Sequence, residues 1–106
     1  RITSFMADSV TPLCFVGAPA TSVFLGSSTI TAGSTFAQAD AYKAADFAMS
    51  TNGGAVGTTS SGGVPVVNRL IIGANIYGSA AVNGPIRRLI YFPARLPNTT
   101  LQRLTQ

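Results

Sequence analysis

Short apolar runs, each closed by a cluster of turn-forming residues, follow one another along almost the whole chain. Gly, Pro, Asn and Ser provide the turn clusters, and helical periodicity is poor until the last residues. This spacing predicts an all-β fold, an antiparallel jelly-roll-type β-sandwich with a short C-terminal helix. Because the chain has 106 residues, it supports one domain at most, so residues 1–106 are expected to form a single β-sandwich module.

The first part of the chain is expected to contain three short strands, at residues 2–6, 13–16 and 22–25. Gly and Pro follow the second of these runs, and a Gly-Ser-Ser cluster follows the third. Residues 34–43 are expected to form a further strand, although the sequence leaves its register open. A helix over residues 36–45 is the alternative there, because that stretch is rich in alanine.

A hairpin is predicted between residues 46 and 59. Phe47, Met49 and Thr51 occupy alternate positions between small residues, as expected for a half-buried strand. The following Asn52-Gly53 pair accepts the positive φ angles of a tight hairpin turn. Residues 55–59 would then form the return strand.

Three more strands are predicted in the last third of the chain, at residues 69–74, 80–82 and 86–92. The segment 86–92 has the strongest strand character, and Pro93 ends it. Ile86 and Leu89 lie three residues apart, which does not fit strict alternation. A β-bulge near Arg87 and Arg88 would place the apolar side chains on the core face and turn both guanidinium groups outward.

The chain is expected to end in a short helix over residues 99–104. Asn98 is the predicted N-cap residue, because its side chain can accept a hydrogen bond from the first free amides. Leu101 and Leu104 are spaced to share the inner face of this helix.

The sequence contains few of the side chains that acid–base catalysis or metal binding requires. There is no His and no Glu, and the acids are Asp8, Asp40 and Asp46, for which capping or solvated roles are expected. Glycosidases need two carboxylates about the scissile bond, and zinc sites need clustered His and Cys. Cys14 is the single cysteine, so no internal disulfide can form, and it is expected to be a small buried hydrophobe. We therefore predict a protein that is not an enzyme and uses no metal or cofactor.

The formal net charge is +4, and most of the cations are arginines in the last third of the chain. They do not form a dense basic run with interleaved aromatics, so nucleic acid is not expected as the partner. No apolar run approaches the roughly 20 residues of a membrane helix, so membrane insertion is not expected either.

A sugar-binding site would combine an aromatic platform with planar polar groups. The candidate residues are Tyr42, Asn52, Asn75, Tyr77 and Asn83. Each also has an ordinary structural role, because Asn suits turn geometry and Tyr suits the edge of a core. Separately, Arg87 and Arg88 are candidates to bind an acidic glycan or a carboxylate of a neighbouring subunit, with a solvated sheet edge as the alternative.

The closing residues 83–105, NGPIRRLIYFPARLPNTTLQRLT, resemble the end of concanavalin A-like (laminin G-like) β-sandwich domains, in particular those of bacteriophage tail and other virion proteins. Residues 45–54 are similar to the family's strand and Asn-Gly hairpin, and residues 69–73 to the strand before the closing segment. Domains of this family are usually longer, so the chain corresponds either to a complete module or to the C-terminal part of a longer domain. The glucanase members need paired Glu residues, which are missing here.

The resemblance implies this fold and a binding or structural role without hydrolysis. The low charge, the many small residues and the lack of a platform for a ligand favour a non-enzymatic structural or decoration module of a bacteriophage or phage-like particle. Its partners would be copies of itself or other virion subunits, and by analogy a trimer is the expected closed form. The alternative is a carbohydrate-binding, lectin-like module of a tail fibre or adhesion protein, whose partner would be a cell-surface glycan. Both place the chain on a virion or an extracellular surface.

Overall fold

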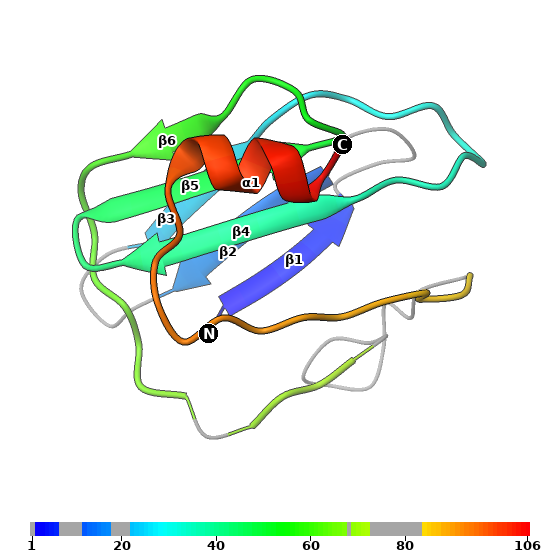
Figure 1. Cartoon of the computed structure of the whole chain (residues 1–106). Helices are drawn as coiled ribbons and strands as arrows, with labels where there is room; N and C mark the ends of the chain where they lie inside the picture. The colour runs from blue at the N-terminus through cyan, green and yellow to red at the C-terminus, as the bar shows by residue number, and fades with distance from the viewer. Residues whose placement is uncertain (1, 7–11, 18–21, 68, 73–83) are drawn as a thin grey trace.

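In this computed structural model, the described residues form two small antiparallel sheets and one short C-terminal helix (Figure 1). The structure describes residues 2–6, 12–17, 22–67, 69–72 and 84–106. In chain order the elements are β1 (Ile2–Met6), β2 (Pro12–Gly17), β3 (Ser22–Gly26), β4 (Gln38–Lys43), β5 (Asp46–Thr51), β6 (Gly57–Thr59) and α1 (Asn98–Leu104).

The first sheet has the strand order β1-β2-β3, and both of its strand pairs are antiparallel. Cys14 of β2 lies opposite Ser4 of β1 and Leu25 of β3. The three predicted strands in this part of the chain are confirmed, each with its boundaries shifted by at most a residue. Turn residues between short apolar runs were therefore sufficient to locate them.

The second sheet has the strand order β4-β5-β6 and is also antiparallel throughout. Lys43 pairs with Asp46, which leaves a two-residue turn in which Ala45 has a φ of 58°. The predicted strand at residues 34–43 is confirmed over 38–43, and the alternative helix over 36–45 is wrong. The alanines that suggested a helix serve packing instead, since Ala39 and Ala41 belong to the cluster beneath α1.

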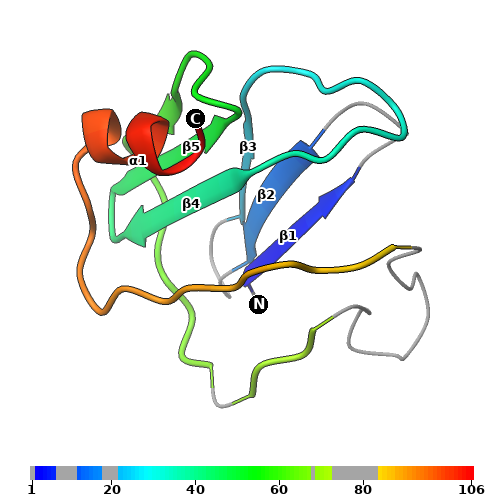
Figure 2. The same ribbon diagram turned by 45° about the vertical axis from the view of Figure 1, so that its right-hand side comes forward.

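Strand β5 is buried on both faces, which corrects the prediction of a half-buried strand. Phe47 and Met49 face the first sheet, whereas Ala48 clusters with Leu101 of α1 on the other side. All of these β5 side chains have no exposed surface. The alternation therefore separates large side chains from small ones, and the three layers are the first sheet, the second sheet and the helix (Figure 2).

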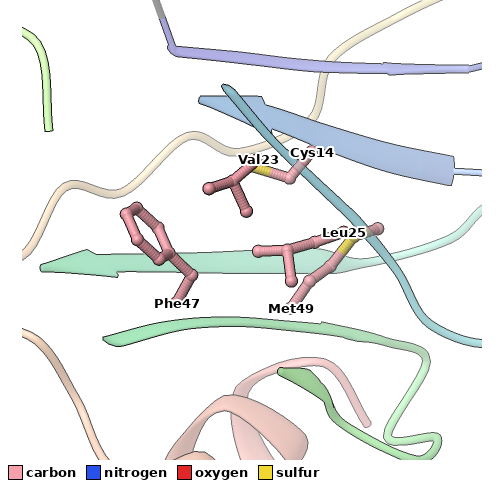
Figure 3. Close-up of a cluster of buried hydrophobic side chains, with 5 residues drawn as sticks. All are labelled: Cys14, Val23, Leu25, Phe47 and Met49. Atoms are coloured by element: carbon pink, nitrogen blue, oxygen red, sulfur yellow. The ribbon is translucent and has the colours of Figure 1, made fainter. Parts of the chain in front are cut away.

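The main core lies between the two sheets. Cys14, Val23 and Leu25 from the first sheet meet Phe47 and Met49 from the second, and their side chains point toward one another (Figure 3). Burying these five side chains stabilises the fold by about 25 cal/mol for each Å² of apolar surface removed from water. Cys14 is one of them, so the expectation of a buried, hydrophobe-like cysteine is confirmed.

The sheets also meet edge to edge where β3 leaves the first sheet. The Thr51 amide donates a 3.2 Å hydrogen bond to the Ser27 hydroxyl oxygen, and this hydroxyl donates a 2.6 Å bond to the Ala55 carbonyl oxygen. Gly57 packs directly on the backbone of Gly26, and a Cβ at Gly57 would overlap the Gly26 carbonyl oxygen. The close approach therefore requires glycine at this position.

The strands predicted over residues 69–74 and 86–92 are not formed in their described parts, 69–72 and 86–92, and the bulge at Arg87 and Arg88 is absent with them. A strand needs a neighbour to satisfy its amides and carbonyls, and no strand pairing involves these residues. The prediction at 80–82 lies outside the described residues. The return strand after the Asn52 turn is also shorter than predicted, at 57–59 instead of 55–59.

Each described sheet joins strands that are consecutive in sequence, so the described residues show two meanders and no jelly roll. What they establish is a mostly stranded chain with two small antiparallel sheets and a C-terminal helix. The helix prediction is confirmed, but two of its details are wrong: Asn98 does not cap the helix, and Leu104 is exposed while Leu101 alone is buried. Pro97 occupies the N-cap position, no side chain caps the helix, and the amides of Thr100 and Leu101 donate to the Pro97 carbonyl oxygen.

The two leucines of α1 offer a test of the third layer, because Leu101 is 3% exposed and Leu104 is 46% exposed. We expect Leu101→Ala to lower the free energy of unfolding by about 2–5 kcal/mol, since it opens a cavity against Ala48. The same change at Leu104 should cost less than about 1 kcal/mol. Urea denaturation followed by circular dichroism measures both, and equal losses would show that α1 does not cover β5.

Candidate functional site

Two stretches of the chain expose large apolar side chains to solvent, and we call them the apolar segments. They comprise residues 64–67 and 69–72, which follow β6, and residues 86–92, which precede α1. Their exposed apolar residues are Val64, Val66, Val67, Leu70, Ile71, Ile72, Ile86, Leu89, Ile90, Tyr91 and Phe92. Leu70 and Tyr91 are each 75% exposed. Soluble monomers rarely expose this much contiguous apolar chain unless it binds something.

The second apolar segment is an extended part of the backbone that lies away from the helix. Figures 1 and 2 both show the chain from residue 84 passing the N-terminal end of β1 before it turns back toward α1. No backbone hydrogen bond joins described residues 86–92 to a strand. Among the described residues, its amides and carbonyls thus have no strand partner, as at the edge of a sheet.

An ion pair fixes the point where this segment enters the helix. Arg95 Nη2 donates to Asp46 Oδ1 at 2.9 Å, and Arg95 Nη1 donates to the carbonyl oxygen of Leu96. The Arg95 side chain is 13% exposed and Asp46 54% exposed. Asp46 was expected to cap or to be solvated, and its pairing with Arg95 could not have been inferred from two residues so far apart in sequence.

The apolar segments carry positive charge and no acid. Arg69, Arg87 and Arg88 are exposed, and no ion pair involves them among the residues that the structure describes. This agrees with the expected outward placement of Arg87 and Arg88, although an irregular segment presents them instead of a bulged strand. The described part of the surface therefore combines apolar, aromatic and cationic groups.

The predicted sugar-binding residues do not form one site in the described structure. Asn52 has a φ of 50° at the hairpin turn, and its Oδ1 accepts a 2.9 Å hydrogen bond from the Ala37 amide. Its side-chain carbonyl therefore joins the turn to the residue before β4, and its positive φ fits the turn role expected for it. Tyr42 lies at the other end of the β4–β5 hairpin, opposite Phe47. The predictions at 75, 77 and 83 lie outside the described residues.

Tyr42 sits at the margin of the main core. It packs against the main cluster while remaining partly exposed. Burial raises the pKa of Tyr42, and Tyr91, Cys14 and Asp40 add to the rise in that order. Tyr42 is thus a core-edge residue, which is the structural role expected for it.

The Asn52–Gly54 turn is locked to the C-terminal helix by hydrogen bonds that the sequence did not suggest. Thr105 Oγ1 accepts a 2.9 Å bond from the Gly53 amide and lies 3.3 Å from Ser50 Oγ. Gln102 Nε2 donates to the Gly54 carbonyl oxygen at 3.1 Å. Thr105 is 2% exposed, so its contact with Ser50 is buried, while the bonds to Gly53 and Gly54 are partly buried. No local motif marks such contacts, because they join residues about fifty positions apart.

Cys14 and Asp40 are the remaining side chains that could take part in acid–base or nucleophilic chemistry. Burial raises the pKa of the Cys14 thiol, and the charge and hydrogen bonding of Asp40 raise it further. Asp40 is half-buried and accepts two hydrogen bonds from Gln38 Nε2, at 3.0 and 3.1 Å, so it is neither a cap nor fully solvated. A neutral buried thiol is a poor nucleophile.

Within the described residues, no three His, Cys, Asp or Glu side chains come together in a way that would hold a metal ion. The same part of the chain contains no helix long and apolar enough to cross a membrane. Comparison with known proteins gives no match to a family model, to a curated protein or to a solved structure. The exposed apolar segments are therefore the strongest candidate for a functional site.

Replacing Thr105 with valine, which has a similar shape but no hydroxyl, tests how much the Thr105 hydroxyl contributes to stability. We expect Thr105→Val to lower the free energy of unfolding by about 1–3 kcal/mol, because the partly buried Gly53 amide loses its acceptor. Thr99→Val is the matched control, since Thr99 is exposed on the same helix and should change stability by less than about 0.5 kcal/mol. Thermal unfolding of the three proteins gives the comparison. A Thr105 variant as stable as the control would show that the Thr105 hydrogen bonds do not stabilise the contact between the Asn52–Gly54 turn and α1.

The raised pKa of Cys14 makes stability depend on pH. In the unfolded chain the thiol ionises at about pH 8.5, whereas in the folded chain it stays neutral. The contribution of Cys14 to the free energy of unfolding is therefore fully present below that pH and is lost as the pH rises. Above about pH 9 we expect the free energy of unfolding to fall by up to about 1.4 kcal/mol per pH unit. Cys14→Ala should remove most of this slope. Rapid alkylation of Cys14 by iodoacetamide in the folded protein would contradict its burial.

Proposed function

We propose that this chain is a non-enzymatic structural module that works by assembling with other protein subunits through its apolar segments. The observation that carries the proposal is the exposure of large apolar side chains over residues 64–72 and 86–92, of which residue 68 lies outside the description. Leaving them in water forfeits about 25 cal/mol per Å² of burial. A partner that covers them recovers this stabilisation.

The sequence pattern of the same residues supports the proposal. Residues 69–72 and 86–92 have the composition of strands but pair with no strand among the residues that the structure describes. We propose that assembly supplies the neighbours and adds strands to the two small sheets, which would produce the jelly-roll-type sandwich expected from the sequence. Strand addition of this kind uses main-chain hydrogen bonds for affinity and side-chain pockets for specificity.

The particle to which the module belongs is proposed from the resemblance of residues 83–105 to the end of virion β-sandwich domains. Under that proposal the chain is a decoration or structural subunit on the surface of a bacteriophage or phage-like particle, with other virion subunits or copies of itself as partners. Residues 45–54 support it by forming the strand and Asn-Gly turn that the resemblance implies. The segment 86–92 would support it by becoming a strand on assembly.

Association at high concentration tests the proposal. Sedimentation velocity over rising concentration should show species larger than the monomer, because the apolar segments cover one another when no partner is present. The double variant Leu70→Ser/Leu89→Ser should shift the onset to roughly tenfold higher concentration. Leu104→Ser is the control, since it removes a partly exposed leucine of α1 outside the segments.

Glycan binding by the same purified protein distinguishes the assembly proposal from the lectin-like alternative. Glycan-array screening should give no binding that depends on Tyr42 or Tyr91. A chain that stays strictly monomeric and binds defined sugars would overturn the assembly proposal in favour of carbohydrate recognition.

A further inference from the structure

The second apolar segment places one arginine on each face of the strand that it could form. In an extended strand successive side chains point to opposite faces. Arg87 would therefore share a face with Leu89 and Tyr91, and Arg88 would share the other face with Ile90. Whichever face a partner covers, it covers a guanidinium group together with apolar side chains.

Covering these arginines without an acid is unfavourable. A charge taken out of water costs several kcal/mol unless a counter-charge and hydrogen bonds replace the solvent. In paired strands, oppositely charged side chains at facing positions stabilise the pair, and like charges destabilise it. The partner strand therefore needs carboxylates opposite Arg87 and Arg88 and apolar side chains beside them.

A second copy of this chain offers little to meet that requirement. Of its three acids, Asp46 is held by Arg95, and Asp40 is half-buried and held by Gln38. Asp8 lies outside the described residues. Each copy also carries a net charge of +4, so bringing two basic segments together adds repulsion.

We propose that residues 86–92 take up an acidic, apolar strand that belongs to a different protein subunit. The incoming strand pairs with the unpaired backbone of 86–92, and its carboxylates meet Arg87 and Arg88. This inference rests on the assembly function proposed above and names the partner's chemistry. On this proposal, the isolated chain self-associates because the partner strand is missing and the apolar residues of 86–92 stay uncovered.

A designed peptide provides the probe. It has roughly ten residues, alternating valine and threonine, with two adjacent glutamates at its centre. Matched peptides carry two glutamines or two lysines in place of the glutamates. Fluorescence anisotropy of each labelled peptide with the full chain measures binding at low and at high salt. The glutamate peptide should bind about tenfold more tightly than the glutamine peptide, lose this advantage in high salt, and suppress self-association.

Two arginine variants locate the effect. Arg87→Gln/Arg88→Gln should abolish the preference for glutamate while leaving the fold intact, because both side chains are exposed. Arg103→Gln is the control, since it removes an exposed cation from α1 and should change nothing. Amide exchange should slow over residues 86–92 when the glutamate peptide is bound.

The failures of the two proposals can be told apart. Equal affinity for the glutamate and glutamine peptides overturns the acidic partner. So does a dimer or trimer of fixed stoichiometry that the glutamate peptide does not disrupt, although that result leaves the assembly function standing. A chain that neither associates nor binds any of the peptides overturns both.

Discussion

The burial of β5 on both faces is the constraint on which the rest of the structure depends. Phe47 and Met49 hold the first sheet, while Ala48 receives Leu101 of the helix. A strand covered on both sides can satisfy its backbone only through β4 and β6, and both pair with it. The order of layers follows, because large residues need the sheet–sheet interface and small ones let the helix approach.

The same constraint explains which parts of the chain lack regular structure. Helix α1 occupies the outer face of the second sheet and the first sheet occupies the inner face. Within the described residues, the segment 86–92 contributes no side chain to either buried cluster. Arg95 and Asp46 then fix where the segment joins the helix, which leaves its apolar residues in solvent. The described residues therefore combine a buried centre with exposed apolar segments, which is the physical basis of the assembly proposal.

Much of this fold could be predicted from local sequence. Turn clusters located β1, β2 and β3, and Asn52-Gly53 located the turn after β5. The two-sided burial of β5 could not be predicted, because alternation of Phe47 and Met49 with small residues looks the same whether one face or both are covered. The strand signal of 86–92 failed because strand formation needs a neighbour, and pattern alone does not show whether the chain supplies one. Long-range contacts such as that of Thr105 with Gly53 could not be predicted, because no local sequence pattern marks them.

Backbone amide hydrogen exchange in the isolated chain, read residue by residue, tests the central claim most directly. The account predicts that the amides of β5 exchange only through global unfolding, while those of residues 86–92 exchange nearly as fast as an unstructured peptide. Protection of 86–92 equal to that of β5 would mean that this segment already belongs to a sheet within the chain, which would contradict the account.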